Sequence, residues 1–421
     1  MRVAILSATS AWGGAENHAI QLARALNGRG HEVLLVELGH EIFQQKNLTL
    51  PGRIELRHID LPRPLEQLSW QEAKRILAQV SADICVFEKG ELDAANFAFD
   101  LAARWNFKAY IAIEQLLAPT MPPKPRRENP QRIFHGWGLW RYVNYLKRRS
   151  RSWAPHKIVC VSDAVRNRLR EEYGFPATKT LTIHNCIDTS LFRRNSEWRS
   201  SVRCAWNIPE NDLVFGAVGR LAPIKSFDKV IELFRRFYLT QPETNAWLVI
   251  VGSGPAADQL RQLADQSGVG NRIKFPGSTD APWQAYNGMD VFLMTSQSEG
   301  LPLALLEAMA CGCCPIAAAV GGVAEVICDE NVGWLIRIGE LDAFVDAMEH
   351  AAGLNESQRT AIGANGRTVI STHFSTEFQM EKFVCLIESA VTNQMPPDYH
   401  QPSQNSELAS KAPKDSSAPV T

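Results

Sequence analysis

The feature of this sequence that most restricts its fold is an alternation of short apolar runs with amphipathic helical patterns, which occurs in both halves of the chain. Such an alternation is typical of parallel α/β sheets. In the first half, the predicted strands span residues 3–6, 32–38, 54–59, 84–87, 109–113 and 157–161. In the second half, they span residues 214–218, 247–251, 272–275, 291–294 and 315–319. The sequence therefore predicts an α/β protein with two doubly wound, Rossmann-like sheets.

Helical periodicity and length give the domain organisation. Helices are predicted between the strands, at residues 14–26, 227–239, 256–266, 302–310 and 341–352. A chain of 421 residues is too long for one ordinary core, and a polar stretch at residues 189–212 separates its two halves. We therefore expect a first domain at 1–195, a second at 196–374, a helix at 375–394 that returns to the first domain, and a disordered tail at 395–421.

Charge, cysteine content and hydropathy exclude several functional classes. The formal net charge of −1 gives no reason to expect nucleic acid as a partner. The nine cysteines are scattered and odd in number, which does not fit a disulfide framework and favours the cytoplasm. No apolar run reaches the length of about 18 residues that a membrane span needs.

Two cations lie in the loop after the first predicted strand of the second half. Ligands of doubly wound sheets bind beyond the carboxyl ends of the strands, and Arg220 and Lys225 in that position suit a diphosphate. A solvated loop with two ordinary surface cations is the alternative. After the first strand of the chain, Gly13 and Gly14 open a helix whose free N–H groups can face an anion, although a plain tight turn uses the same residues.

The strongest local pattern follows the predicted strand at 291–294. Glu299 lies in the loop, Gly300 allows a sharp turn, and Pro302 fits the start of a helix. Glu307 lies about one and a half turns into that helix. Carboxylates accept hydrogen bonds from paired hydroxyls, which a ribose and a sugar ring both offer. A helix cap at Glu299 and a salt bridge at Glu307 are the alternative.

In combination, these motifs resemble the retaining glycosyltransferases of family 4, which have the GT-B fold of two Rossmann-like domains facing each other across a cleft. The resemblance covers nearly all of the chain up to about residue 391. It rests on the order and spacing of Gly-Gly-Ala-Glu at 13–16, Val-Ser at 161–162, Asn-Cys-Ile-Asp at 185–188 with Phe192, Gly-Arg-Leu at 219–221 with Lys225, Val-Gly-Ser-Gly-Pro at 251–255, Phe-Pro-Gly at 275–277, and Glu299 with Glu307.

The resemblance implies roles for individual residues. Arg220 and Lys225 would hold the donor diphosphate, and Glu299 would contact the transferred sugar, so that these three residues are the expected catalytic set. Glu307 would bind the nucleotide ribose. The other expected donor-binding positions are Gly13, Gly14, Gly277, Gly300, Leu301, Pro302 and Leu303.

The resemblance also implies an activity. We expect a sugar to pass from a UDP- or GDP-sugar to a glycan, lipid-linked or small-molecule acceptor, with retention and without a cofactor or metal. The sequence has no Asp-x-Asp, the pair that metal-dependent transferases of another fold use. Two other functions stay open: a GT-B enzyme of another class, such as a nucleotide-sugar epimerase or a phosphorylase, and a non-catalytic nucleotide-sugar-binding partner.

The sequence departs from the family pattern at three places. Ser226 and Cys186 stand where glycine is usual. Many members carry a histidine after the fifth strand of the first domain, whereas this chain has Glu114 and Gln115 there. These two residues are therefore candidate contacts to the acceptor or to the sugar. His18, on the helix that follows Gly13 and Gly14, is a third candidate, and a surface or packed histidine is the alternative there.

A basic, aromatic segment is the remaining feature. Residues 124–157 carry ten Lys or Arg and one acidic residue, Glu128, among several Trp and Tyr. Such a segment suits an anionic membrane surface or a negatively charged acceptor, and it would place a cytoplasmic protein at the inner face of the cell membrane. A partly buried helix with a solvated basic face is the alternative.

Overall fold

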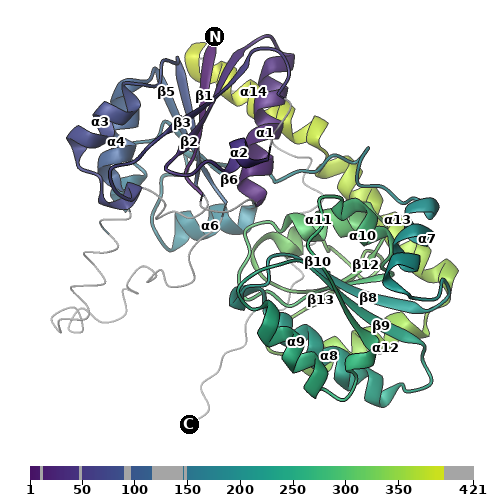
Figure 1. Cartoon of the computed structure of the whole chain (residues 1–421). Helices are drawn as coiled ribbons and strands as arrows, with labels where there is room; N and C mark the ends of the chain where they lie inside the picture. Colours follow the sequence, from purple (N-terminus) through teal and green to yellow (C-terminus); the bar gives the residue numbers. More distant parts are fainter. Residues whose placement is uncertain (10–12, 47–49, 90–95, 116–145, 147–148, 393–421) are drawn as a thin grey trace, which may run out of the picture.

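The computed structural model of the protein describes residues 1–9, 13–46, 50–89, 96–115, 146 and 149–392. Within these residues, the chain forms two lobes, each built on its own parallel sheet (Figure 1). The tail at 395–421 and most of the basic segment at 124–157 lie outside the described residues, so the predictions for them remain predictions.

The first lobe contains a seven-stranded sheet in the order β3-β2-β1-β4-β5-β6-β7. All neighbouring strands in it run parallel. Its strands are β1 (Arg2–Ser7), β2 (Glu32–Leu38), β3 (Ile54–Ile59), β4 (Ile84–Lys89), β5 (Ala109–Glu114), β6 (Lys157–Cys160) and β7 (Thr180–Thr182). Each predicted strand of the first half is present, and the short edge strand β7 is an addition.

The second lobe contains a six-stranded parallel sheet in the order β10-β9-β8-β11-β12-β13. Its strands are β8 (Leu213–Val218), β9 (Ala246–Val251), β10 (Ile273–Gly277), β11 (Val291–Met294), β12 (Cys314–Ala318) and β13 (Trp334–Ile336). Five of them were predicted, and β13 is an addition at the edge. In both sheets the strand order reverses beside the first strand, which is the position where doubly wound sheets bind ligands.

Helices cover both sheets, because parallel strands are apolar on both faces and need cover on each. They are α1 (Gly14–Gly28), α2 (Ile42–Gln45), α3 (Trp70–Leu77), α4 (Phe97–Asn106) and α6 (Asp163–Glu171) in the first lobe. In the second they are α7 (Ser196–Trp206), α8 (Phe227–Thr240), α9 (Ala257–Gln266), α10 (Pro282–Asn287), α11 (Leu303–Ala310), α12 (Leu341–Gly353) and α13 (Glu356–His373).

The C-terminal helix α14 (Thr376–Thr392) crosses back from the second lobe and packs on α1 of the first, as predicted (Figure 1). Side-chain contacts join α14 to the end of α1: Arg29 forms an ion pair with Glu381, and His31 Nε2 lies 2.9 Å from Glu388 Oε1. Among the described residues, no helix has the length and apolar character that crossing a membrane requires.

Several helices were given no range by the sequence analysis, and α7 and α13 show why. The stretch at 189–212 contains α7, whose apolar residues Trp198, Val202 and Trp206 lie four positions apart among polar and charged neighbours, and whose buried side also includes the charged Arg203. The buried face of α13 is formed by Gly363, Gly366 and Ile370. A Cβ at Gly363 would lie 2.1 Å from the carbonyl oxygen of Gly312, so this face is close-packed with small residues that a search for large apolar side chains misses.

Candidate functional site

The carboxyl edges of the two sheets enclose two adjoining cavities. The smaller, of about 560 Å³, is lined by Gly13, Gly14 and Gln115 from the first lobe and by Lys225, Glu299 and Glu307 from the second. The larger, of about 1280 Å³, runs beside it along α1 and reaches Gly252, Ser278 and Asp280. Arg220 and Glu307 line both cavities. The residues predicted to hold a donor diphosphate and a donor sugar are therefore brought together in one cleft.

The loop after β8 presents Arg220 and Lys225 to this cleft. Arg220 is exposed and, in the described part of the chain, has no ion-pair partner. A close backbone contact holds the loop: a Cβ at Gly252, whose φ is +149°, would lie 1.9 Å from the carbonyl oxygen of Gly219. Only glycine permits this approach, so the start of the loop is fixed against the end of β9.

Ser226 ends this loop in the left-handed conformation, with φ of 52°. The family's usual glycine takes that conformation freely, whereas serine is strained in it. Hydrogen bonds compensate: its hydroxyl accepts from Gln297 Nε2 at 3.0 Å, and its carbonyl accepts from Thr295 Oγ1 at 2.9 Å. At Cys186, the other departure from the family pattern, the described backbone has no positive φ, so no glycine is needed there.

Lys225 and Glu299 form an ion pair across the cleft floor. Lys225 Nζ lies 2.6 Å from Glu299 Oε1, and the two side chains are 32% and 10% exposed. The contact brings together residues from the loops after β8 and β11, the two central strands of the second sheet. A negatively charged ligand would therefore meet the Lys225 ammonium group in a position that its ion pair with Glu299 already fixes.

Glu307 lies in α11, where its Oε2 accepts a hydrogen bond from the hydroxyl of Tyr286 at 2.7 Å. Burial raises the pKa of Glu307 to about 7, while the bond from Tyr286 opposes that rise. The carboxylate therefore titrates near neutral pH, and its second oxygen is available to a diol in the cleft.

Two helix N-termini meet in the cleft from opposite lobes. α1 begins after Gly13 and α11 after Pro302, and neither has a side-chain cap. A Cβ at Gly14 would lie 3.0 Å from Leu303 Cδ1, so the two helix starts are in contact. Free N–H groups and the positive ends of two helix dipoles at one place favour an anion.

The remaining predicted residues lie in different environments. Gln115 lines the smaller cavity, whereas His18 and Glu114 are buried, at 3% and 1% exposed, and do not line either cavity. Gly277 ends β10, and its carbonyl accepts from Gly252 N at 2.9 Å. The residues just after it, Ser278 to Asp280, line the larger cavity.

Three polar residues of the site were missed by the sequence analysis: Tyr286, Glu88 and Glu16. Tyr286 and Glu88 contact Glu307 and Gln115 respectively. Glu16 lines the smaller cavity and accepts from Ser7 Oγ at 3.3 Å, and its burial raises the pKa of its carboxyl group. A usable signal existed for Glu88, because this charged residue directly follows the apolar run at residues 84–87.

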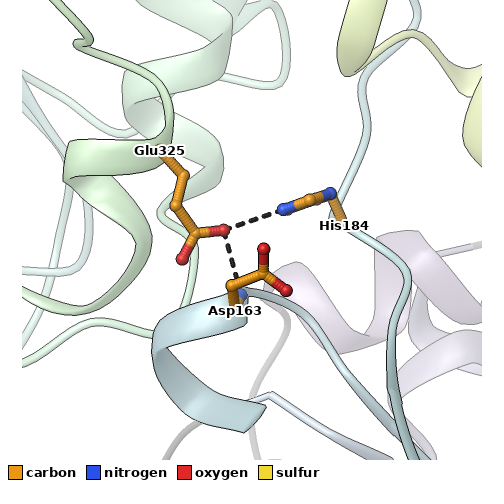
Figure 2. Close-up of side chains that lie close together, drawn as sticks. All are labelled: Asp163, His184 and Glu325. Atoms are coloured by element: carbon orange, nitrogen blue, oxygen red, sulfur yellow. Dashed lines mark hydrogen bonds and ion pairs between the residues drawn. The ribbon is translucent and has the colours of Figure 1, made fainter. Parts of the chain in front are cut away.

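A cluster of Asp163, His184 and Glu325 has the residue types of a metal site (Figure 2). However, Glu325 caps α6 from the other lobe: its two oxygens accept from Asp163 N at 2.9 Å and from Ala164 N at 2.8 Å, and Oε2 also contacts His184 Nε2 at 2.8 Å. Asp163 is engaged by Thr182 and Arg166. Protein groups thus already engage both oxygens of Glu325 and Oδ1 of Asp163, and the cluster functions as a helix cap that joins the lobes.

Two family models match the chain. The model described as "Glycosyltransferase Family 4" matches residues 12–191, and the model described as "Glycosyl transferases group 1" matches residues 199–369. Between them they cover both lobes.

Curated relatives match over part of their length. N-acetyl-alpha-D-glucosaminyl L-malate synthase of Bacillus anthracis is 26% identical over 220 residues, which are 52% of this chain and 56% of the relative. D-inositol 3-phosphate glycosyltransferase of Kribbella flavida is 29% identical over 204 residues, 46% of this chain and 48% of the relative. The match thus spans about half the length of these relatives.

Solved structures match over nearly the whole chain. Anabaena Alr3699/HepE in complex with UDP-glucose has a TM-score of 0.73 at 19% identity, covering 92% of this chain and 100% of that one. Sucrose-phosphate synthase from Thermosynechococcus elongatus has a TM-score of 0.71 at 17% identity, covering 93% and 100%. At these identities the likeness shows the fold alone, and it confirms the predicted GT-B arrangement.

Proposed function

The chain belongs to glycosyltransferase family 4, whose models match both of its lobes, and we propose that it transfers a sugar from a nucleotide diphosphate to an acceptor hydroxyl with retention and without a metal. One observation carries this proposal: Arg220, Lys225, Glu299 and Glu307 line a single cleft, opposite the Gly13–Gly14 helix start of the other lobe.

The cations and helix ends would stabilise the leaving group. As the bond to the sugar breaks, negative charge grows on the diphosphate, and fixed positive groups stabilise that charge more than the ground state. Arg220, Lys225 and the uncapped starts of α1 and α11 supply such groups. A bound metal ion is then unnecessary, and attack from the face that the leaving group departs from requires no protein nucleophile.

The two carboxylates would hold different parts of the donor. Glu307 opens to both cavities and would accept hydrogen bonds from the ribose diol, with Tyr286 fixing one of its oxygens. Glu299 opens only to the smaller cavity, where it would bind the sugar beside the diphosphate. The base would then lie in the larger cavity near Gly252 and Ser278.

A titration of donor binding tests the role of Glu307. Ribose hydroxyls donate to the ionised carboxylate, and burial raises the pKa of this group to about 7. Binding therefore favours the deprotonated form, and the affinity for UDP-glucose should rise about tenfold between pH 6 and pH 8. Calorimetry measures this, and UDP-glucose is preferred to UDP because it has no phosphate that titrates in this range. The Glu307→Gln variant should lose the pH dependence, and an equal slope in both proteins would contradict the assignment.

Substitution separates the two carboxylates. Glu307→Ala should weaken the binding of a free nucleotide diphosphate about tenfold, because a charge-assisted hydrogen bond to the ribose is lost. Glu299→Ala should leave that affinity nearly unchanged while it lowers turnover, because its partner is the sugar. Calorimetry with the nucleotide alone decides between them, and the reverse pattern would mean that the two roles are exchanged.

The donor and acceptor are the open part of the proposal. We propose a UDP- or GDP-sugar donor and a glycan, lipid-linked or small-molecule acceptor; the Anabaena structure holds UDP-glucose, and two relatives are named for small acceptors. A cytoplasmic protein at an anionic membrane surface would use the basic segment, of whose described residues Arg149 and Trp153 are exposed, the latter by 59%.

A thermal-shift panel in EDTA tests whether the chain binds a nucleotide sugar without a metal, which the proposed function requires. UDP, GDP, ADP and CMP and their sugars are added to the full chain, and a ligand at 100 times its dissociation constant should add about 2.7 kcal/mol of stability. Stabilisation by a nucleotide sugar without a metal supports the proposal, and no stabilisation by any of them contradicts it. Incubation with donor alone separates the rivals, because an epimerised sugar would identify an epimerase.

A further inference from the structure

A buried polar chain runs from α1 to the smaller cavity. His18 Nδ1 lies 2.5 Å from Oε1 of Glu88, at the end of β4. The other carboxylate oxygen of Glu88 accepts from Gln115 Nε2 at 3.2 Å. His18 and Glu88 are 3% and 1% exposed, while Gln115 is half-buried and lines the cavity. The buried residues His18 and Glu88 are therefore linked by hydrogen bonds to the amide of Gln115, which a ligand in the cavity can reach.

The hydrogen bonds among His18, Glu88 and Gln115 fix which end of the Gln115 amide a ligand meets. An ionised carboxylate only accepts hydrogen bonds, so the NH₂ group of Gln115 must face Glu88. Turning the amide over would place two acceptors together and leave a buried carboxylate oxygen unpaired, which is costly. In the described part of the chain, nothing donates to the side-chain oxygen of Gln115. That oxygen is left as a hydrogen-bond acceptor for the cavity.

The position of Gln115 matches the expected place of the sugar. A Cβ at Gly300 would lie 1.9 Å from the carbonyl oxygen of Gln115, so the turn that carries Glu299 rests directly on Gln115. A sugar bound by Glu299 beside the diphosphate is then next to the Gln115 amide. Sugar hydroxyls donate hydrogen bonds, and an exposed amide oxygen accepts them.

His18 has the environment of a positioning residue. Its ring packs edge-on against Phe383 of α14, with centroids 4.8 Å apart, and its Nε2 is buried without a partner among the described residues. Since His18 does not line either cavity, it can affect a bound ligand only by holding Glu88 in place.

We propose that Gln115 binds a hydroxyl of the transferred sugar through its side-chain oxygen, and that Glu88, held by His18, is a positioning residue that keeps the amide in this orientation. This inference rests on the proposed function, because it needs a nucleotide sugar in the cleft. It assigns the donor-sugar contact of this chain to an amide in place of the imidazole that many family members have.

The test compares binding of sugar nucleotides with binding of the parent nucleotides. The full chain is titrated by calorimetry with UDP-glucose, GDP-mannose and ADP-glucose, and with UDP, GDP and ADP. Gln115→Ala should lower the affinity for the nucleotide sugar about tenfold, the loss of one neutral hydrogen bond, and leave the nucleotide affinity unchanged. Glu88→Gln should give the same selective loss, because a glutamine there can donate to Gln115 and turn its amide.

The double variant distinguishes positioning from a general structural role. If Glu88 acts only through Gln115, Glu88→Gln adds no loss to Gln115→Ala, whereas independent effects would add. Glu37→Gln is the matched control, because Glu37 is a 2% exposed carboxylate at the end of β2 that accepts from Phe43 N and does not line either cavity. It should bind like the wild type.

Each outcome has a definite meaning. If wild type binds one of the three nucleotide sugars and both single variants bind it equally well, the Gln115 assignment is overturned while the proposed function stands. An unchanged donor affinity with a raised KM for the acceptor also overturns it, because the contact then belongs to the acceptor. If wild type binds no nucleotide sugar, neither these three nor those of the thermal-shift panel, the proposed function fails, and this inference fails with it.

Discussion

Replacing Lys225 or Arg220 with alanine is expected to lower turnover on the order of 100-fold or more. Both cations line the cleft where the donor diphosphate would lie, and removing a group that stabilises charge in the transition state costs about this factor. The fall should appear mainly in kcat, because the negative charge on the diphosphate increases as the sugar leaves. Steady-state kinetics with the donor found in the thermal-shift panel measures the effect.

Lys225→Ala should be the more disruptive of the two. Lys225 is paired with Glu299, whose side chain is 10% exposed, so the removal of Lys225 also leaves a mostly buried carboxylate without this partner. Lys229→Ala is the matched control: Lys229 lies four residues after Lys225, in the first turn of α8, where it is exposed and lines neither cavity. Near-wild-type turnover in both Lys225→Ala and Arg220→Ala would contradict the diphosphate assignment.

Much of the fold could be predicted because parallel strands are buried on both faces and read as apolar runs. β2, β3 and β11 have the predicted bounds, and each of the other predicted strands differs from its prediction by one or two residues at an end. The edge strands β7 and β13 were missed because only three residues of each pair with the sheet. Their sequences, Thr-Leu-Thr and Trp-Leu-Ile, are too short to stand out from a loop.

The site could be predicted only in part, because spacing reveals loops but not the contacts between them. Arg220, Lys225, Glu299 and Glu307 were recognisable, since each lies near the carboxyl end of a strand. The ion pair between Lys225 and Glu299 joins residues 74 positions apart. The orientation of Gln115 depends on Glu88 and His18, and nothing in the sequence shows that these three residues meet.

The buried Arg203 is the clearest example of a residue that the sequence did not reveal. It lies in α7, within the stretch that was predicted to be a polar boundary, and it is 1% exposed. Its Nη2 lies 2.7 Å from Asp290 Oδ2, its Nε donates to Gly288 O at 3.0 Å, and its Nη1 donates to the carbonyls of Glu210 and Asp212 at 2.6 and 2.8 Å. The guanidinium thus ties α7 to the amino ends of β8 and β11.

Replacing Arg203 with methionine is therefore expected to destabilise the protein by about 3–5 kcal/mol, because it breaks a buried ion pair and leaves several buried carbonyls without a donor. The midpoint of thermal unfolding, followed by circular dichroism, should fall by about 10 °C. Asp290 keeps its contact to Arg199 Nη2 at 2.8 Å, which limits the loss.

The matched control is Arg236→Met on α8, whose ion pair with Glu232 is largely solvent-exposed and should contribute little. Because Arg203 lies at the amino ends of the strands and the cleft at their carboxyl ends, nucleotide affinity well below the midpoint should be unchanged. If Arg203→Met unfolds at the wild-type temperature, the guanidinium does not hold the second lobe together.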